Sequence, residues 1–185
     1  MTTDLSPQSF QLETDRLILR PFVMTDAVAF AEICANPNVM RYIGDGKPLD
    51  LATVSSRMAD WIALYAQQNY GLLALTLKGT AQLIGFCGLL HQTVDGEAWI
   101  ELGYRLDEQF WGKGIATEAA IAVKDYAFHQ CNIPTLISII HHENVNSKRV
   151  VEKLGMTLMK KTQFKDKLVD IFWIHNLHLN HGTSS

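Results

Sequence analysis

The sequence has few cysteines, and it lacks the patterns of several common protein classes. Cys34, Cys87 and Cys131 are odd in number and far apart, which argues against a disulfide framework or a zinc site and favours free thiols in a reducing cytoplasm. No apolar run is long enough to span a bilayer, and the first residues lack the apolar core of a signal peptide. We therefore expect a cytoplasmic protein with no membrane partner.

An excess of charge of one sign is also missing. The formal net charge is −3, which gives no electrostatic reason to expect a nucleic-acid partner. Hydrophobic residues make up 48% of the 185-residue chain and charged residues 19%, a balance typical of a globular protein. This length fits one domain, which we place at residues 1–185 with loose ends at about 1–11 and 181–185.

Familiar phosphate and metal motifs are absent too. The chain contains no GxxxxGK[ST] run, and Gly112-Lys-Gly114 is not followed by the third glycine of a dinucleotide fingerprint. The cluster at residues 141–143, His-His-Glu, lacks the spacing of HExxH. Because adjacent residues of an extended chain point to opposite faces, a loop at a strand end is favoured over a metal site.

The apolar pattern predicts an α/β protein. Runs of strand character, bounded by turn residues, occur at residues 17–22, 72–77, 83–90, 98–106, 136–140, 156–162 and 168–174. Helical spacing with suitable cap residues occurs at about 26–35, 50–68 and 144–155, and helical spacing also runs from Ile115 to at least Tyr126. The helix after residue 115 separates two strands, so a crossover to a parallel neighbour is expected there.

The central stretch, residues 101–119, changes from strand to turn to helix. Gly112 and Gly114 lie in the turn, and the helical pattern begins at Ile115. The first turn of a helix has unpaired N–H groups and a positive dipole end, and glycines let the backbone approach a ligand closely. This order indicates a cradle for a phosphate or pyrophosphate. Two glycines that only allow tight packing are the alternative.

Several motifs in this order resemble one family. Gln109-x-x-Gly112-x-Gly114 resembles the Q/R-x-x-G-x-G/A signature of the GNAT acyl-CoA N-acyltransferases. Glu-Leu-Gly-Tyr at 101–104, Trp-Gly-Lys-Gly at 111–114 and Ala-Thr-Glu-Ala at 116–119 are similar to its branch of ribosomal-protein N-terminal acetyltransferases, the RimJ/RimL type. Thr-Asp-Arg-Leu-Ile-Leu-Arg at 14–20 resembles the family's first strand. The resemblance runs from about residue 12 to about residue 177.

The resemblance implies a fold and an activity. The expected fold is a mixed, mostly antiparallel sheet of about seven strands with a central splay, flanked by about four helices. The expected reaction moves an acetyl group from acetyl-CoA to a primary amine, most closely a protein N-terminal α-amine. A polyamine or aminoglycoside acceptor, or a non-catalytic CoA-binding regulatory protein, is the alternative. The resemblance also allows a homodimer.

The resemblance assigns coenzyme A contacts to three segments. The pantetheine arm would pair along the strand at 102–104, the pyrophosphate would lie on the glycine turn, and Asn144 would cap a helix beside the thioester. The implied contact residues are Leu102, Gly103, Tyr104, Gln109, Trp111, Gly112, Lys113, Gly114, Ile115, Ala116, Asn144 and Ser147.

The chemistry also requires a base for the amine and a partner for the leaving thiolate. Glu101, on the strand leading into the turn, is the first candidate for the base. Glu97, Asp166 and Asp170 are alternatives, and a structural role for Glu101 stays open. Many family members place a tyrosine where this chain has Val151, and Ser147 matches the serine used instead in the resembling branch. Positioning alone is a further alternative.

One wall of the acceptor site in this family comes from the second helical region and the loop before it. Tyr42, Trp61 and Tyr65 are therefore candidates for acceptor contacts. A helical apolar stripe normally packs into the core, which favours the core interpretation for these aromatic residues.

Overall fold

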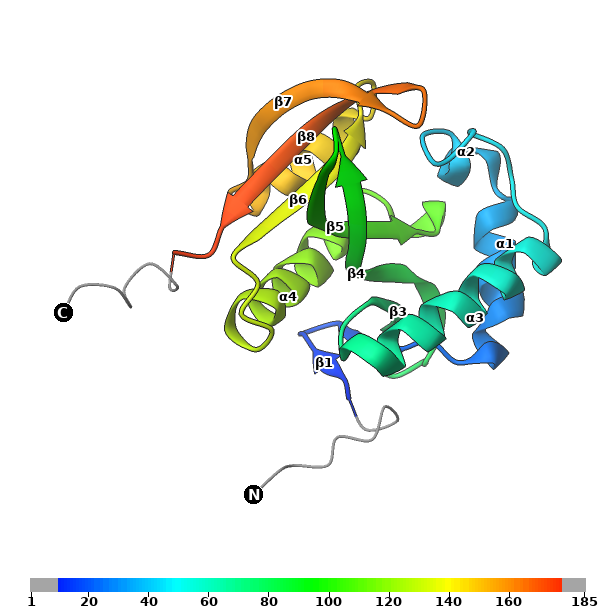
Figure 1. The fold of residues 1–185 in the computed structure, drawn as a ribbon. Coiled ribbons are helices and arrows are strands. Elements are labelled where there is room, and N and C mark those ends of the chain that lie inside the picture. The colour runs from blue at the N-terminus through cyan, green and yellow to red at the C-terminus, as the bar shows by residue number, and fades with distance from the viewer. Residues whose placement is uncertain (1–9, 178–185) are drawn as a thin grey trace.

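In a computed structural model of the protein, residues 10–177 are described, and they form one mixed sheet with helices on both faces (Figure 1). The eight strands have the spatial order β1-β2-β3-β4-β5-β6-β8-β7. Their bounds are β1 Leu12–Glu13, β2 Leu17–Pro21, β3 Leu72–Leu77, β4 Leu83–Val94, β5 Glu97–Leu106, β6 Thr135–His141, β7 Thr157–Phe164 and β8 Lys167–His175. The helices are α1 Ala27–Ala35, α2 Pro37–Met40, α3 Leu51–Gln68, α4 Ile115–His129 and α5 Val145–Lys153.

The architecture confirms the predicted fold class. All neighbouring strands are antiparallel except β5 and β6, which are parallel and joined by α4, as the predicted crossover requires. The described sheet has one strand more than predicted, because the two-residue β1 pairs with β2. The described part also has one α-helix more than predicted, namely α2.

Cap residues explain where the helices begin. The side chain of Asp50 accepts a hydrogen bond from the N–H of Thr53 at the start of α3. α2 begins directly after α1, because the side chain of Asn36 accepts a hydrogen bond from the N–H of Asn38 and Pro37 occupies the first helical position. Hydrogen bonds from local cap residues thus determine where α2 and α3 begin.

The sheet separates two apolar clusters. α4 and α5 pack on one face with residues such as Leu102 and Leu136, and α1, α2 and α3 pack on the other with Phe86 (Figure 1). The ring of Trp61 lies 5.7 Å from that of Phe86, within the second cluster.

Core packing confirms the favoured core interpretation of Trp61 and Tyr65 and corrects the extent of the loose leader. Trp61 and Tyr65, candidates for acceptor contacts, belong to the apolar clusters, and Tyr65 is only 5% exposed. Phe10, placed in the loose leader, packs its ring 4.9 Å from that of Tyr126. The rest of the predicted loose ends, except residue 11, lies outside the described residues.

The predicted splay lies between β5 and β6. These strands have a single register pair, Glu101 with Ile137, and then diverge. The hydroxyl of Ser138 donates a 2.8 Å hydrogen bond to the carbonyl of Leu102, and so replaces a missing backbone partner at the start of the gap. The backbone of β5 beyond this point therefore faces an opening in the middle of the sheet.

Candidate functional site

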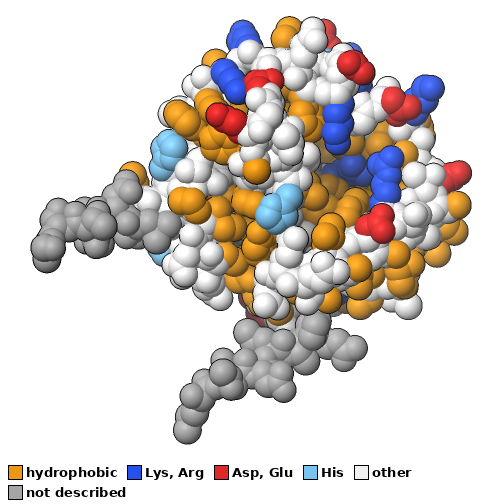
Figure 2. Space-filling view, in the orientation of Figure 1, with side chains coloured by type: hydrophobic (Ala, Val, Ile, Leu, Met, Phe, Trp, Pro, Cys, Tyr) orange, Lys and Arg blue, Asp and Glu red, His pale blue; other side chains and the backbone are white. Residues whose placement is uncertain are grey.

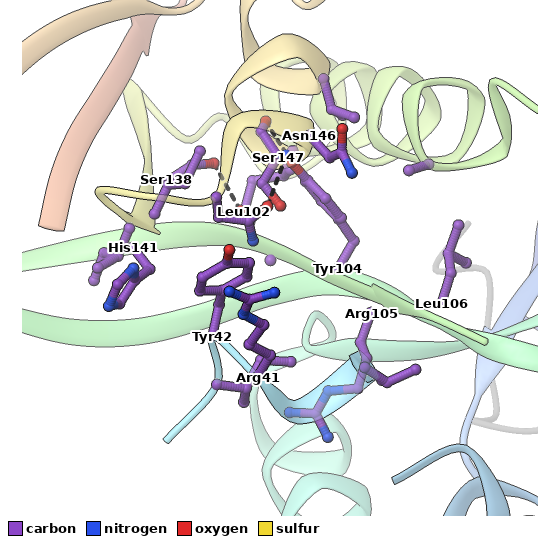
Figure 3. Close-up of a pocket in the computed structure, with 18 of the residues that line it drawn as sticks. Arg41, Tyr42, Leu102, Tyr104, Arg105, Leu106, Ser138, His141, Asn146 and Ser147 are labelled. Atoms are coloured by element: carbon purple, nitrogen blue, oxygen red, sulfur yellow. Dashed lines mark hydrogen bonds between the residues drawn. The ribbon is translucent and has the colours of Figure 1, made fainter. Parts of the chain in front are cut away.

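A cleft of about 910 Å³ opens where β5 and β6 diverge (Figure 3). Its lining comes from β4, β5 and β6, from the first turn of α4, from α5 and the residue before it, from α2 and the residues that follow it, and from the β7–β8 hairpin. Segments distant in sequence thus converge on the opening, whose volume suits a sizeable ligand.

Most of the residues implied as coenzyme A contacts line this cleft. Ten of the twelve do so: Leu102, Gly103, Tyr104, Trp111, Gly112, Gly114, Ile115, Ala116, Asn144 and Ser147. The side chain of Gln109 instead donates a 2.6 Å hydrogen bond to Asp107 and lines a separate hollow beside α1. Lys113 places its Nζ 5.5 Å from the centre of the Phe110 ring.

The glycine turn has the geometry of an anion cradle. Gly112 and Gly114 have φ values of 72° and 75°, in the left-handed region that favours glycine. Gly114 is the N-cap of α4, so no side chain caps the first N–H groups of that helix. These N–H groups and the positive end of the α4 dipole fit a phosphate or pyrophosphate.

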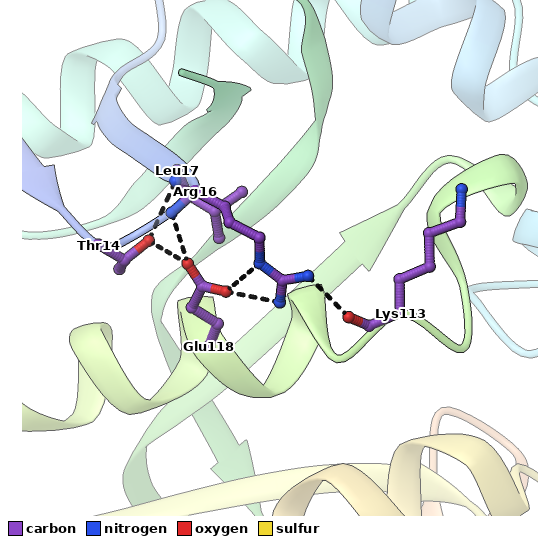
Figure 4. Close-up of polar contacts among 5 residues, drawn as sticks. All are labelled: Thr14, Arg16, Leu17, Lys113 and Glu118. Atoms are coloured by element: carbon purple, nitrogen blue, oxygen red, sulfur yellow. Dashed lines mark hydrogen bonds and ion pairs between the residues drawn. The ribbon is translucent and has the colours of Figure 1, made fainter. Parts of the chain in front are cut away.

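An ion pair holds the turn from the other side (Figure 4). Arg16 donates from Nε to Glu118 on α4 at 2.6 Å and from Nη1 to the carbonyl of Lys113 at 2.9 Å. The same carboxylate accepts from Thr14 at 2.5 Å and from the backbone N–H of Arg16 at 3.0 Å. The residues before β2 therefore clamp the turn onto α4.

Sequence reasoning missed this clamp as a feature of the site. Arg16 and Glu118 both lie within motifs that carry the family resemblance, but about a hundred positions apart, and no periodicity links them. Burial raises the pKa of Glu118, but hydrogen bonds from Thr14 and Arg16 outweigh this, so its pKa lies below its ordinary value.

Glu101 lies at the start of the gap and lines the cleft. Its carboxylate accepts a 2.7 Å hydrogen bond from Gln92 and another from the backbone N–H of Ile139. Burial raises the pKa of Glu101, and these hydrogen bonds and the charge of Lys165 lower it only in part. A half-buried carboxylate with a raised pKa is a stronger proton acceptor than a free glutamate.

The alternative bases lie elsewhere. Glu97, Asp166 and Asp170 do not line the cleft. Glu97 and Asp166 are exposed in hairpins, and Asp170 is buried with Lys148 as its ion-pair partner at 2.5 Å. The geometry therefore favours Glu101 over the other three.

Comparison with known proteins decides the family. Residues 16–157, more than half of the chain, match the family model described as an acetyltransferase (GNAT) domain. The chain belongs to the GNAT acetyltransferase family. It is 30% identical over 148 residues to the N-acetyltransferase YnaD of Bacillus subtilis, covering 78% of this chain and 81% of YnaD.

Solved structures agree with this membership. An acetyltransferase from Agrobacterium tumefaciens is 32% identical, has a TM-score of 0.76, and is matched over 95% of this chain and 99% of its own. RimL, a ribosomal L7/L12 α-N-protein acetyltransferase solved with coenzyme A, shares the fold at 16% identity and a TM-score of 0.76, over 90% and 98% of the two chains. This GNAT protein is an acyl-CoA-dependent N-acetyltransferase, and acetyl-CoA is its acyl donor.

In this acetyltransferase the first turn of α5 faces the cleft. Asn144 caps the helix by accepting from the N–H of Ser147 at 3.1 Å, and both residues line the opening. The hydroxyl of Tyr104 donates to the carbonyl of Ser147 at 3.0 Å, and burial raises the pKa of this tyrosine. Val151, at the position where many family members have a tyrosine, is fully buried in the core.

Tyr42 is the one aromatic candidate for acceptor contacts that lines the cleft. Its ring lies 5.1 Å from that of His141 at the end of β6, and burial lowers the pKa of this histidine. Within residues 10–177 no group of three or more His, Cys, Asp or Glu side chains could hold a metal ion. Within the same range no helix combines the length and the apolar character needed to cross a membrane.

Proposed function

We propose that this enzyme acetylates protein N-terminal α-amines. The observation that carries this choice is the charge of the cleft lining, which includes six Lys or Arg side chains and only two carboxylates, Glu101 and Glu108. A polyamine or aminoglycoside carries several positive charges, and this lining would repel it. The fold shared with RimL supports the same acceptor class.

The residues around the gap have distinct roles in this proposal. Acetyl-CoA supplies a thioester, whose carbonyl is the electrophile. The cradle at the start of α4 binds its phosphates, and the exposed backbone of β5 at residues 102–104 aligns its pantetheine arm. Glu101 takes the proton from the attacking amine, directly or through water, and Ser147 gives a proton to the leaving thiolate.

Ligand-dependent thermal unfolding tests the binding half of the proposal. Acetyl-CoA or CoA at about 100 times its dissociation constant should stabilise the protein by roughly 2.7 kcal/mol. For a domain of this size that corresponds to several degrees, at about 2–4 °C per kcal/mol. ATP, which lacks pantetheine, should give a smaller shift. An equal or larger shift with ATP would contradict the assignment of the cleft.

An acceptor panel tests the chemical half. Peptides with free N-termini, the same peptides blocked at the N-terminus, spermidine and an aminoglycoside are compared by release of free CoA. Turnover should require the free α-amine. Faster turnover of spermidine or the aminoglycoside would assign the enzyme to small-molecule acetylation instead.

We also propose that the enzyme works in the cytoplasm. Cys34 and Cys87 are buried and Cys131 is half-buried, and all three are free thiols. Burial raises the pKa of each thiol, which keeps it in the protonated, unreactive form. Free thiols are typical of a reducing compartment. Recovery of the enzyme with extracellular proteins during cell fractionation would overturn this placement.

A further inference from the structure

Four of the cations in the cleft lie away from the cradle. Arg41 follows α2, Arg105 lies on β5, and Lys165 and Lys167 come from the β7–β8 hairpin. Figure 2 shows Lys and Arg side chains around a hollow of this face whose floor is largely hydrophobic. We call these four residues the basic rim.

The rim brings two distant segments together. Lys167 Nζ lies 3.8 Å from the point where a Cβ on Gly46 would stand, so the hairpin reaches the loop between α2 and α3. Lys165 is close enough to Glu101 for its charge to lower the pKa of that carboxyl. Arg41 lies over the ring of Tyr42, with its Cζ 5.2 Å from the ring centre. The rim therefore surrounds the approach to Glu101.

Arg105 is the unusual member of the rim, because it is only 9% exposed and has no acidic partner among the described residues. Its Nη1 donates to the sulfur of Cys34 at 3.1 Å, whereas its Nε is buried without a hydrogen-bond partner. Its Cζ lies 5.3 Å from the ring centre of Phe86. A buried guanidinium without a carboxylate costs stability, and an anion would complete its hydrogen bonds.

The side chains of Tyr104 and Arg105 leave β5 in opposite directions (Figure 3). Tyr104 reaches the first turn of α5, beside the residues that bind acetyl-CoA, and Arg105 reaches α1. The remaining two cations of the lining, Arg149 and Lys153, lie one turn apart on α5. We assign these two cations to the phosphates of acetyl-CoA, which leaves the basic rim for the other substrate.

The described residues do not neutralise the rim. Apart from Glu101, the only carboxylate in the lining is Glu108, which already accepts hydrogen bonds from Asn36 and Asn38 at 2.8 and 3.0 Å. No rim residue takes part in any ion pair of the part of the chain that the structure describes. Four cations without an ion-pair partner among the described residues, one of them buried, therefore lie around the cleft that the acceptor is proposed to enter.

We propose that the acceptor carries a carboxylate close to the amine that is acetylated, and that the basic rim binds this carboxylate. The inference rests on the proposed function, since it assumes that the acceptor enters beside Glu101. In a protein acceptor the carboxylate is an Asp or Glu side chain within the first residues. A free amino acid offers the same chemistry through its α-carboxylate, and the experiment separates the two sources.

The test compares three peptides that start with serine, have amidated C-termini, and differ only at the second and third positions: Asp-Glu, Ala-Ala or Lys-Lys. Free glutamate is the fourth acceptor. At saturating acetyl-CoA and low salt, kcat/KM for the acidic peptide should exceed that for the neutral peptide by about tenfold, and the ratio should fall as salt screens the rim. The Lys-Lys peptide should be the poorest of the three.

A charge reversal with a matched control locates the effect. Lys167→Glu should reduce the ratio of acidic to neutral kcat/KM by about tenfold, which corresponds to about 1.4 kcal/mol. Lys161→Glu makes the same change on β7 at an exposed lysine that does not line the cleft, and it should leave the ratio unchanged. Equal effects of the two variants would overturn the assignment to the rim.

The outcomes separate the two proposals. Equal rates for acidic and neutral peptides would overturn the carboxylate inference and leave N-terminal acetylation standing. Turnover of glutamate alone would support the carboxylate inference and refute the protein acceptor. If no acceptor turns over, thermal shifts with CoA present decide the matter, because the acidic peptide must still stabilise the wild type more than the neutral one. Equal shifts would overturn the inference.

Discussion

The hydroxyl of Tyr104 donates a 3.0 Å hydrogen bond to the backbone carbonyl of Ser147 and so joins β5 to the first turn of α5. The two residues belong to elements on opposite sides of the gap between β5 and β6. Both residues line the cleft, so this bond ties the strand proposed to align the acyl donor to the helix beside it. The side chain of Tyr104 thus connects two of the elements that line the cleft.

Tyr104→Phe removes this bond and keeps the ring. We expect KM for acetyl-CoA to rise several-fold, because α5 loses its tie to β5. The lost hydrogen bond should cost about 1 kcal/mol of unfolding free energy. Thermal unfolding and initial-rate kinetics measure both effects. An unchanged KM with a lowered melting temperature would show that the bond is only structural.

Ser147→Ala removes the hydroxyl but keeps the carbonyl that Tyr104 binds. We expect kcat to fall, with little change in the melting temperature or in the dissociation constant of acetyl-CoA, because the proposed role is proton donation to the thiolate. Stopped-flow release of CoA measures the chemical step directly. If kcat is unchanged, positioning accounts for the reaction and Ser147 is not an acid.

Glu101→Gln should lower kcat/KM by about 10²–10⁴-fold, the usual contribution of a general base. In the wild type, kcat/KM should rise with pH through the raised pKa of Glu101, and this acid limb should be lost in the variant. Glu97→Gln, at an exposed carboxylate outside the cleft, is the matched control. The α-amine of the acceptor adds an acid limb at about pH 8 in both proteins. A further acid limb at lower pH that survives in the Glu101 variant would assign the base elsewhere.

The raised pKa of Glu101 also predicts how the free energy of unfolding depends on pH. Between the ordinary pKa of a glutamate and the raised pKa of Glu101, the native state binds more protons than the unfolded state. Stability therefore decreases as pH rises through this window, and the cost persists above it. At neutral pH Glu101→Gln should leave the free energy of unfolding unchanged or higher, as urea titrations at several pH values would measure.

Arg16→Ala should weaken acetyl-CoA binding although Arg16 does not line the cleft. The change removes the hydrogen bond to the Lys113 carbonyl and frees the turn that carries Gly112 and Gly114. We expect KM for acetyl-CoA to rise more than kcat falls. Arg57→Ala, at an exposed arginine on α3, is the control. A lowered melting temperature with an unchanged dissociation constant for CoA would limit Arg16 to a structural role.

Arg105→Met should separate stability from specificity. Replacement of a buried, unpaired charge by an apolar side chain of similar length is often neutral or stabilising. We therefore expect the melting temperature to stay the same or rise, while kcat/KM for the acidic peptide falls relative to the neutral one. A variant that is less stable and keeps the wild-type preference would place Arg105 among the structural residues.

Local signals predicted much of the fold. Asp50 and Asn144 cap their helices through side chains that reach N–H groups three residues away, so the sequence pattern contains the whole interaction. Gly114 at the start of α4 is of the same kind, since its φ value and its place before Ile115 are local properties. The glycine turn and the starts of α3, α4 and α5 could therefore be predicted without the structure.

Contacts between distant segments could not be predicted in this way. Trp61 and Tyr42 are both aromatic residues near the expected acceptor wall, and only packing places the first in the core and the second at the cleft. Arg105 appeared as an ordinary strand residue, because neither Cys34 nor Phe86 is near it in sequence. Gln109 matches the motif by position, but its side chain donates a hydrogen bond to Asp107. The motif does not specify the residue at position 107, so it could not predict this contact.

The gap between β5 and β6 is a free edge in the interior of a sheet. Unpaired strand edges attract strands from other chains and promote aggregation, so proteins commonly protect them with charged or polar side chains. At the start of this gap the Ser138 hydroxyl donates to the carbonyl of Leu102, and the Glu101 carboxylate accepts from the N–H of Ile139. Glu101, the residue proposed as the base, thus also satisfies a backbone N–H group at this strand edge. We expect bound acetyl-CoA to cover the remaining unpaired backbone of the gap. The tendency of the enzyme to self-associate should therefore decrease when acetyl-CoA is plentiful.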